Sequence, residues 1–278
     1  MKKIICLLLS VILATGMLVS CNKKTDVSDF TYEANETGIT ITKYVGTSKK
    51  VSIPDYIDNT PVTQIGSRAF CENENITSVL IPNTVEIIGD NAFYCCTKLK
   101  TVNFPEGLTV IGESAFSGCY LLKSVDLPST VQNIYSFAFS FCDCLDAITV
   151  SQQNPKFTSV DGVLYNSDGS VLLIYPAGKK DTSFKIPEGV VTVGMSAFSY
   201  CYNLSEITVS STVEILGNYS FYFCRFLTNI NVGSNVTGIG TEAFGYCESL
   251  TVTCPEGSYA HKYAKEHGIK VNPIAPAA

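Results

Sequence analysis

Cysteine is the residue type whose number and spacing in this chain most suggest chemistry. The sequence has 12 cysteines but only 2 histidines among its 278 residues. Six of the cysteines recur in one register: Cys96, Cys119, Cys142, Cys201, Cys224 and Cys247. Zinc sites favour Cys-x-x-Cys pairs or added histidines, and this spacing offers neither, so we predict no metal. We expect a buried ladder of thiols. Disulfides stay open as an alternative, because neighbouring thiols would lie near bridging distance.

The histidines and the turn aspartates give no catalytic or calcium-binding pattern. His261 and His267 share one segment near the C-terminus, where we expect solvated helix residues rather than ligands or general bases. Asp161 and Asp168 lack the clustered carboxylates that a calcium loop needs. The sequence has no Gly-x-Ser-x-Gly motif and no Cys–His pair outside the ladder and that segment. We therefore predict no enzyme activity, no catalytic residue and no cofactor.

The N-terminus has the pattern of an export signal. Residues 1–20 begin with Met-Lys-Lys and continue as an apolar run that is short for a membrane-spanning helix. The run ends in Leu-Val-Ser-Cys, which resembles a bacterial lipobox and implies a lipid on Cys21; an ordinary signal peptide is the alternative. We assign residues 21–29 to a lipidated tether. We expect a membrane-anchored lipoprotein of the cell envelope, at the outer membrane or cell surface, that meets the membrane through its lipid alone.

Phenylalanine marks an internal repeat. Seven residues follow the pattern Ile-Gly-x-x-Ala-Phe or a close variant: Phe70, Phe93, Phe116, Phe139, Phe198, Phe221 and Phe244. Their spacing is 23 residues, except for 59 between Phe139 and Phe198, and 23 lies within the range of leucine-rich repeats. Further apolar residues recur eight and five positions before the Phe, and six, nine and eleven positions after it. One such unit cannot bury its apolar residues alone, so the units must stack.

The segment after each Phe is predicted to be a strand. Val102-Asn103-Phe104 alternates apolar and polar residues, which places one face inward, and successive strands should stack in parallel about 4.8 Å apart. Prolines 82, 105 and 128 close the first three strands. A glycine recurs at one turn position, where a positive φ would explain it: Gly66, Gly89, Gly112, Gly194, Gly217 and Gly240. The predicted fold is a repeat solenoid, a right-handed, β-rich leucine-rich-repeat superhelix with stacked parallel strands.

The array has atypical ends and one interruption. We assign residues 30–272 to the repeat domain and residues 273–278 to a tail. Within the domain, residues 30–61 form an N-terminal cap and residues 255–270 a C-terminal cap, which contains a short helix between Ser258 and Gly268. The long spacing contains residues 154–176, where Asp161-Gly162 and Asp168-Gly169 predict an inserted hairpin.

The repeat pattern resembles a known family. Ile-Gly-x-x-Ala-Phe-x-x-Cys-x-x-Leu-x-x-Val-x-Ile-Pro is similar to the BspA-like leucine-rich repeat of the LRR_5 type. The interruption Phe-x-Ser-x-Asp-Gly-Val-Leu-Tyr and the terminal Gly-Ser-Tyr-Ala-x-Lys-Tyr-Ala resemble the same family. The resemblance covers about residues 30–271. It implies bacterial surface or secreted proteins, some of them adhesins for host matrix proteins, without catalytic residues or a cofactor.

We expect a non-catalytic binding or adhesion protein that acts as a monomer on an unidentified protein, either a host matrix protein or a cell-surface protein. The candidate binding face is the outward side of the strands: Thr101, Asn103, Ser124, Asp126, Thr149, Glu206, Thr208, Asn229 and Asn231. These residues would equally suit a solvated strand face. A glycan-binding protein is an alternative, since Phe141, Tyr200, Phe223 and Tyr246 form a column of aromatics, although such a column is more often a packing ladder. A structural spacer is a third alternative. Nucleic acid is not expected, because the formal net charge is −6 and basic runs are lacking.

Overall fold

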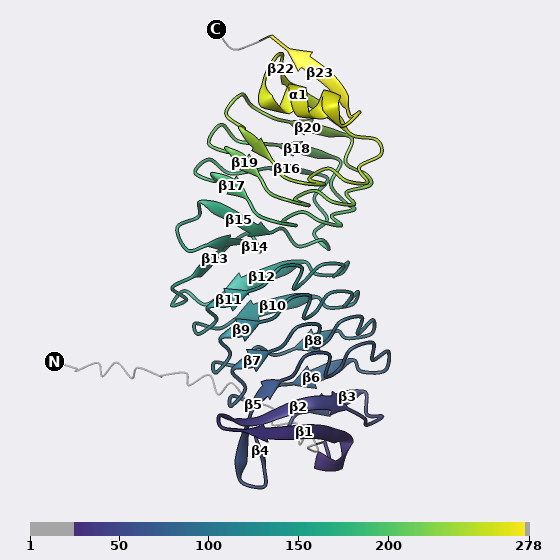
Figure 1. Ribbon diagram of the computed structural model, residues 1–278, viewed down its shortest axis with the longest axis vertical. Coiled ribbons are helices and arrows are strands. Elements are labelled where there is room, and N and C mark those ends of the chain that lie inside the picture. Colours follow the sequence, from purple (N-terminus) through teal and green to yellow (C-terminus); the bar gives the residue numbers. More distant parts are fainter. Residues whose placement is uncertain (1–24, 276–278) are drawn as a thin grey trace, which may run out of the picture.

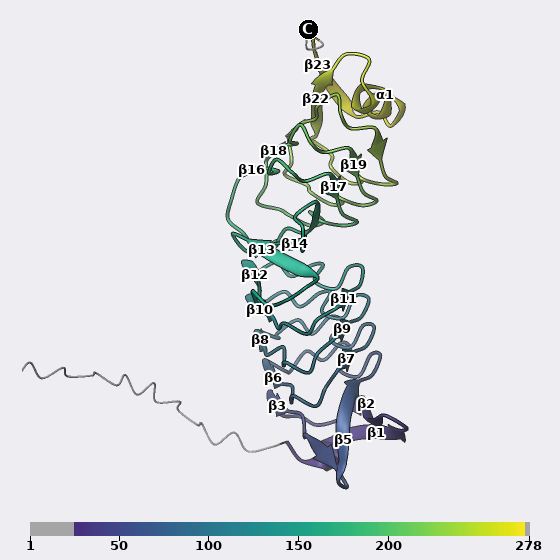
Figure 2. The ribbon, with the colours of Figure 1, turned by 90° about the vertical axis from the view of Figure 1, so that its left-hand side faces the viewer.

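The protein is a long solenoid in which short turns stack along one axis (Figure 1). The computed structural model describes residues 25–275. The predicted export signal, Cys21 and residues 276–278 lie outside the described residues. The predicted solenoid of stacked parallel strands is confirmed, and Figure 2 shows the turns edge-on.

A short β-structure closes the N-terminal end. Its elements are η1 (Val27–Asp29), β1 (Phe30–Asn35), β2 (Gly38–Tyr44), β3 (Lys50–Ser52), β4 (Tyr56–Ile57) and β5 (Thr60–Ile65). Strand β1 runs antiparallel to β2, and β2 pairs in parallel with β5, so β1 covers the edge of the stack. Residues 25–29, which the sequence assigns to the tether, pack on this cap: the Ser52 N–H donates to the Thr25 hydroxyl over 2.8 Å.

Each regular turn carries two strands, although the sequence predicts only one. The predicted strands are β6 (Ser78–Leu80), β8 (Thr101–Val102), β10 (Ser124–Leu127) and β12 (Ala147–Val150). The second set is β7 (Ile87–Ile88), β9 (Val110–Ile111) and β11 (Asn133–Ile134). Equivalent residues pair one repeat apart, as Val79 with Val102 and Ile88 with Ile111. The second strands are only two residues long, too short for the alternation that reveals a strand in sequence.

The 59-residue spacing contains three antiparallel strands. These are β13 (Phe157–Val160), β14 (Val163–Asn166) and β15 (Val171–Ile174), and the turn of the first hairpin is Asp161-Gly162, as predicted. Strand β15 then pairs in parallel with β17 (Thr192–Val193), which restarts the stack. Leu164 belongs to the core before the hairpin, whereas Val163 and Tyr165 belong to the core after it. The hairpin therefore joins two hydrophobic cores.

The second block repeats the architecture of the first. Its strands are β16 (Ser183–Lys185), β18 (Glu206–Thr208), β20 (Asn229–Asn231) and β22 (Thr251–Pro255) on one side, and β17, β19 (Ile215–Leu216) and β21 (Gly238–Ile239) on the other. The helix α1 (Tyr259–Glu266) and the strand β23 (Lys270–Ile274) close the C-terminal end. Ser258 caps α1 by accepting from the His261 N–H, and Gly268 has a φ of 68°. The predicted capping helix is confirmed.

Stacked phenylalanines run through both cores. The rings of Phe70, Phe93, Phe116 and Phe139 lie 4.8 to 5.5 Å apart, centroid to centroid. Those of Phe198, Phe221 and Phe244 lie 5.0 and 5.5 Å apart. Tyr44 extends the first series at the cap, and Tyr175 begins the second series 5.1 Å from Phe198. The repeated Phe is therefore the central core residue of every turn, as its register predicts.

The positive φ predicted for the recurring glycines is wrong. Among the described glycines, those with positive φ are elsewhere, and Gly112 is not among them. A Cβ on Gly112 would lie 2.6 Å from the backbone nitrogen of Asp90 in the preceding turn. The repeat therefore needs glycine because adjacent turns approach each other closely. The sequence cannot separate this requirement from an unusual backbone angle.

Candidate binding surfaces

The predicted binding face consists of polar side chains that bond to one another along the stack. Thr101 donates to the Ser78 hydroxyl over 3.0 Å, and Thr149 donates to the Asp126 carboxylate. In the second block the Asn231 amide donates to Glu206 over 3.3 Å, and Thr253 donates to the Asn229 side chain over 2.9 Å. Ser124 is exposed and Thr208 is half-buried in the same face. The structure therefore brings all nine predicted residues onto one side of the solenoid, but most are already hydrogen-bonded.

Asn103 shows most clearly that this face stabilises the stack. Strand β8 ends at Val102, and the Asn103 side chain continues its pairing with the neighbouring turn. Its oxygen accepts from the Ile81 N–H and its amide donates to the Ile81 carbonyl, both over 2.7 Å. The side chain thus takes the place of a strand residue.

The aromatic residues form a continuous stack on the loop edge. We call Phe141, Tyr200, Phe223 and Tyr246 the aromatic column. Their rings stack from turn to turn with centroid distances of 3.5, 5.4 and 4.3 Å. Tyr200 is the most buried ring at 7% exposure, Phe141 and Phe223 are half-buried, and Tyr246 is 55% exposed. The column is both a packing ladder and, at its C-terminal end, an open surface.

Neighbouring side chains widen this surface. The guanidinium of Arg225 lies 4.7 Å from the centre of the Phe223 ring, which is a cation–π distance. The edge of Tyr222 meets the Tyr246 ring at 5.3 Å, and Phe226 is 63% exposed beside Arg225. Burial raises the pKa of Tyr200, which keeps its phenol neutral. The other repeats have different residue types at the positions of Arg225 and Phe226. The repeat pattern therefore could not have identified these two residues.

The column occupies a backbone position that is unusual for bulky residues. All four of its residues have positive φ, between 56° and 65°. The first three repeats place Glu72, Cys95 and Gly118 at the same position, also with positive φ. The turn itself therefore imposes the left-handed conformation, which costs a non-glycine residue about 1–2 kcal/mol. Ring stacking, worth roughly 0.5–1.5 kcal/mol per pair, offsets this cost where the residue is aromatic.

The thiol ladder lies in the interior. The ten cysteines between residues 25 and 275 are free thiols, and most of the repeated ones are fully buried. The Cys96 thiol donates to the Phe70 carbonyl over 3.1 Å, and the same bond recurs from Cys224 to Phe198 over 3.0 Å. Burial raises the pKa of Cys96 to about 12 and also raises that of Cys142. These thiols are poor nucleophiles and serve as packing groups.

The remaining candidate chemistry is sparse. His261 is buried, and its Nδ1 accepts from the Gly257 N–H over 3.0 Å. The prediction that it is solvated is therefore wrong, because the helix end turns that face onto the core. Within residues 25–275, no group of three or more His, Cys, Asp and Glu side chains is placed to hold a metal ion. In the same range, no helix has the length and apolarity to cross a membrane.

The chain belongs to the family of BspA type leucine rich repeat regions, whose model matches residues 48–166 and 177–263 in six copies. A comparison with curated proteins found no match. A leucine-rich repeat protein from Eubacterium ventriosum has a similar structure: 27% identity, a TM-score of 0.65, and coverage of 90% of this chain and 73% of that one. The leucine rich repeat protein of T. pallidum is 26% identical with a TM-score of 0.53, over 92% of this chain and 100% of that one.

The pneumococcal vaccine antigen PcpA shares the fold. It is 19% identical with a TM-score of 0.51, over 84% of this chain and 81% of that one. The family and the fold together define a repeat scaffold for protein interaction.

Proposed function

We propose that this protein is a non-catalytic binding protein of the cell envelope and that it contacts a partner protein through the aromatic column. The observation that carries the proposal is the exposed ring of Tyr246, which contacts the half-buried rings of Tyr222 and Phe223 and has Arg225 nearby over the Phe223 ring. Tyrosine, phenylalanine and arginine are enriched in protein interfaces, and tyrosine and arginine are also enriched among their energetic hot spots. Rings already held by stacking lose little conformational freedom on binding, which favours affinity.

The aromatic column is a better contact surface than the predicted strand face. The strand-face groups Asn103 and Asp126 already have hydrogen-bond partners in the fold. A partner that used them would have to replace those bonds, with little net gain. Contact with the exposed ring face of Tyr246 breaks no such bond, and covering it removes apolar area from water at about 25 cal/mol per Å².

A glycan is a weaker second candidate. Sugars stack on the open faces of aromatic rings, but Tyr200 has Phe141 on one face and Phe223 on the other. Tyr246 ends the column and is the ring with the most exposure. A single ring is a small platform for a glycan, whereas ring edges and an arginine suit a protein surface.

The position of the column fits anchoring by a lipid on Cys21. Thr25, the first described residue, packs on the N-terminal cap, whereas Tyr200, Phe223 and Tyr246 belong to the block after the hairpin, which extends to the C-terminal end (Figure 1). A lipid four residues before Thr25 would hold the cap near the membrane and direct the aromatic surface away from it. The lipid and the cell-envelope location remain proposals from the sequence.

Binding of the purified protein to an array of extracellular matrix proteins and glycans tests the proposal. We expect a saturable protein hit that Tyr246→Ala combined with Arg225→Ala weakens at least about tenfold, since hot-spot residues contribute 2 kcal/mol or more. The matched control is Asp126→Ala on the strand face, which should leave binding within about twofold, the range of near-neutral interface substitutions.

Three outcomes would contradict the proposal. Loss of binding in the strand-face variant alone would restore the surface predicted from sequence. Glycan hits without protein hits would assign the column to sugar binding. An absence of hits of both kinds would favour the spacer.

A further inference from the structure

The interruption breaks a backbone hydrogen-bond ladder on the loop edge. In each regular turn, three N–H groups around the core Phe donate to the next turn. The N–H groups of Ser114, Phe116 and Gly118 donate to the carbonyls of Ser136, Ala138 and Ser140 over 2.8 to 3.0 Å. The same three bonds join the turn of Phe198 to the turn of Phe221. The loops of neighbouring turns are thus paired as closely as strands.

The turn before the hairpin has no such partner. Its equivalent N–H groups are those of Phe137, Phe139 and Phe141, and none has an acceptor among the described residues. Strand β11 in the same turn pairs only with β9, so the carbonyl of Ile134 also faces the interruption without a donor from the described chain. Three N–H groups and one carbonyl of this turn therefore face the interruption without a partner from the described residues.

The opposite wall offers the complementary groups. The Tyr175 N–H bonds to the Ala197 carbonyl, but the Met195 carbonyl has no donor within residues 25–275. Among the described residues, the Ser199 carbonyl accepts only a 4.0 Å contact from the Cys201 thiol. The Ser196 hydroxyl is buried and has no hydrogen-bond partner in the part of the chain that the structure describes. One wall thus presents N–H donors and the other presents acceptors, separated by a missing half-turn.

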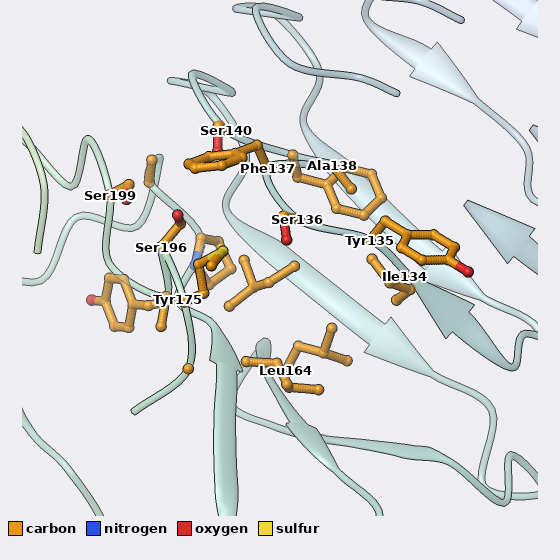
Figure 3. Close-up of a pocket in the computed structure, with 18 of the residues that line it drawn as sticks. Ile134, Tyr135, Ser136, Phe137, Ala138, Ser140, Leu164, Tyr175, Ser196 and Ser199 are labelled. Atoms are coloured by element: carbon orange, nitrogen blue, oxygen red, sulfur yellow. The ribbon is translucent and has the colours of Figure 1, made fainter. Parts of the chain in front are cut away.

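A cavity of about 190 Å³ lies between these walls (Figure 3). Ile134, Phe139, Leu164 and Tyr175 line its apolar part. It interrupts the Phe ladder, since Phe139 and Tyr175 make no ring contact with each other whereas every regular pair does. A cavity of roughly 150 Å³ accepts benzene, so this one has room for a phenyl ring.

The surroundings of the cavity leave one open approach. On the outer flank, Phe141 stacks on Tyr200 and the Phe137 ring lies 6.1 Å from Tyr219, so rings bridge the two blocks there. Tyr135 and Met195, which also line the cavity, are 55% and 44% exposed. The open side is therefore the one next to β11, where an extended segment can run alongside the strand.

We propose that this interruption is a docking groove for an extended peptide segment of a partner protein, which inserts one phenylalanine side chain between Phe139 and Tyr175. An anion would match the N–H wall but would be repelled by the carbonyls opposite. A peptide backbone supplies acceptors to one wall and donors to the other, as strand addition requires. Between two regular turns, the corresponding backbone groups bond to the neighbouring repeat, which supplies an extended chain and a core Phe. The groove should therefore accept a peptide segment of the same kind. The groove adjoins the aromatic column at Phe141 and Tyr200, whereas Tyr246, the exposed end of the column, does not line it.

A peptide with the sequence of residues 107–118, one regular half-turn that contains Phe116, is the direct probe. Labelled with a fluorophore, it should bind the full protein saturably by fluorescence polarisation. The same peptide with Phe116→Ser should bind at least about tenfold more weakly, because the serine variant has no apolar ring to bury in the cavity. This comparison uses the unaltered protein, so it needs no variant to fold.

A matched pair of protein variants locates the site. Ser196→Tyr fills the mouth of the cavity, and the fold tolerates an aromatic at this turn position because Phe137 and Tyr219 occupy its equivalents with the same positive φ. It should abolish peptide binding. Ser114→Tyr, at the equivalent position of a fully paired turn, should leave binding unchanged. The proposal is overturned if the peptide shows no saturable binding, if Phe116→Ser binds equally well, or if a folded Ser196→Tyr protein binds like the unaltered one.

Discussion

The Phe ladder makes a quantitative prediction for Phe116→Ala. The Phe116 side chain is fully buried, and its ring stacks on Phe93 at 5.0 Å and on Phe139 at 5.5 Å. The edge of Phe104 meets it at 5.4 Å. Truncating a buried Phe costs about 3–5 kcal/mol through lost burial and the cavity left behind. Three ring contacts, worth roughly 0.5–1.5 kcal/mol each, place this site toward the upper end of that range.

Urea unfolding followed by far-ultraviolet circular dichroism measures the change, with the chain's 15 tyrosines as a second, fluorescent probe. Coincident transitions would justify a two-state free energy. Phe226→Ala is the control, since that ring is 63% exposed and its loss should change the free energy of unfolding by less than about 0.5 kcal/mol. A loss below about 1 kcal/mol for Phe116→Ala would refute the central position of the ring.

Three further predictions concern the turns and the thiols. Gly112→Ala should destabilise by about 1–3 kcal/mol because its Cβ would meet the Asp90 backbone, whereas Gly233→Ala, with nothing within 4 Å, should be neutral in the same urea assay. Asn103→Ala should cost about 1–3 kcal/mol by stranding the Ile81 peptide groups, and thermal unfolding that matches the unaltered protein would contradict this. Burial raises the pKa of Cys96 from 9.0 to about 12, so the folded state holds a proton that the unfolded state releases. Stability from this thiol is complete well below pH 9 and falls as pH rises toward 12, by about 1.4 kcal/mol per pH unit between the two pKa values. The loss of stability between pH 7 and pH 10 should therefore be smaller in Cys96→Ala than in the unaltered protein.

Periodicity predicted the parts of the fold that depend on one repeated register. The Phe positions, the strand after each Phe and the hairpin at Asp161-Gly162 all follow from apolar spacing and turn residues. The second strand of each turn could not be predicted in this way, because a strand of two residues is too short to show an alternation of apolar and polar residues. The prediction of a positive φ failed because a recurring glycine can indicate either a positive φ or a close approach between two backbones, and the sequence does not distinguish them.

The candidate surfaces were only partly predictable. The sequence placed Asn103 and Asp126 on one outward face, but their mutual hydrogen bonding depends on which turns become neighbours. It also placed Tyr200 and Tyr246 in one column without separating the buried ring from the exposed one. The burial of each ring depends on how close its turn lies to the end of the stack. The sequence of a single repeat does not contain this information. The groove at the interruption arises from missing pairing, which leaves no residue signature.

Tyrosine footprinting of the complex tests the central claim most directly. The partner found on the array is added, and exposed tyrosines are nitrated and quantified by mass spectrometry. The aromatic surface predicts protection of Tyr246, which is 55% exposed, and no change at Tyr56, which is 58% exposed in the N-terminal cap. Unchanged nitration of Tyr246 at saturating partner, or protection confined to Tyr56, would contradict the proposal that the aromatic column is the binding surface.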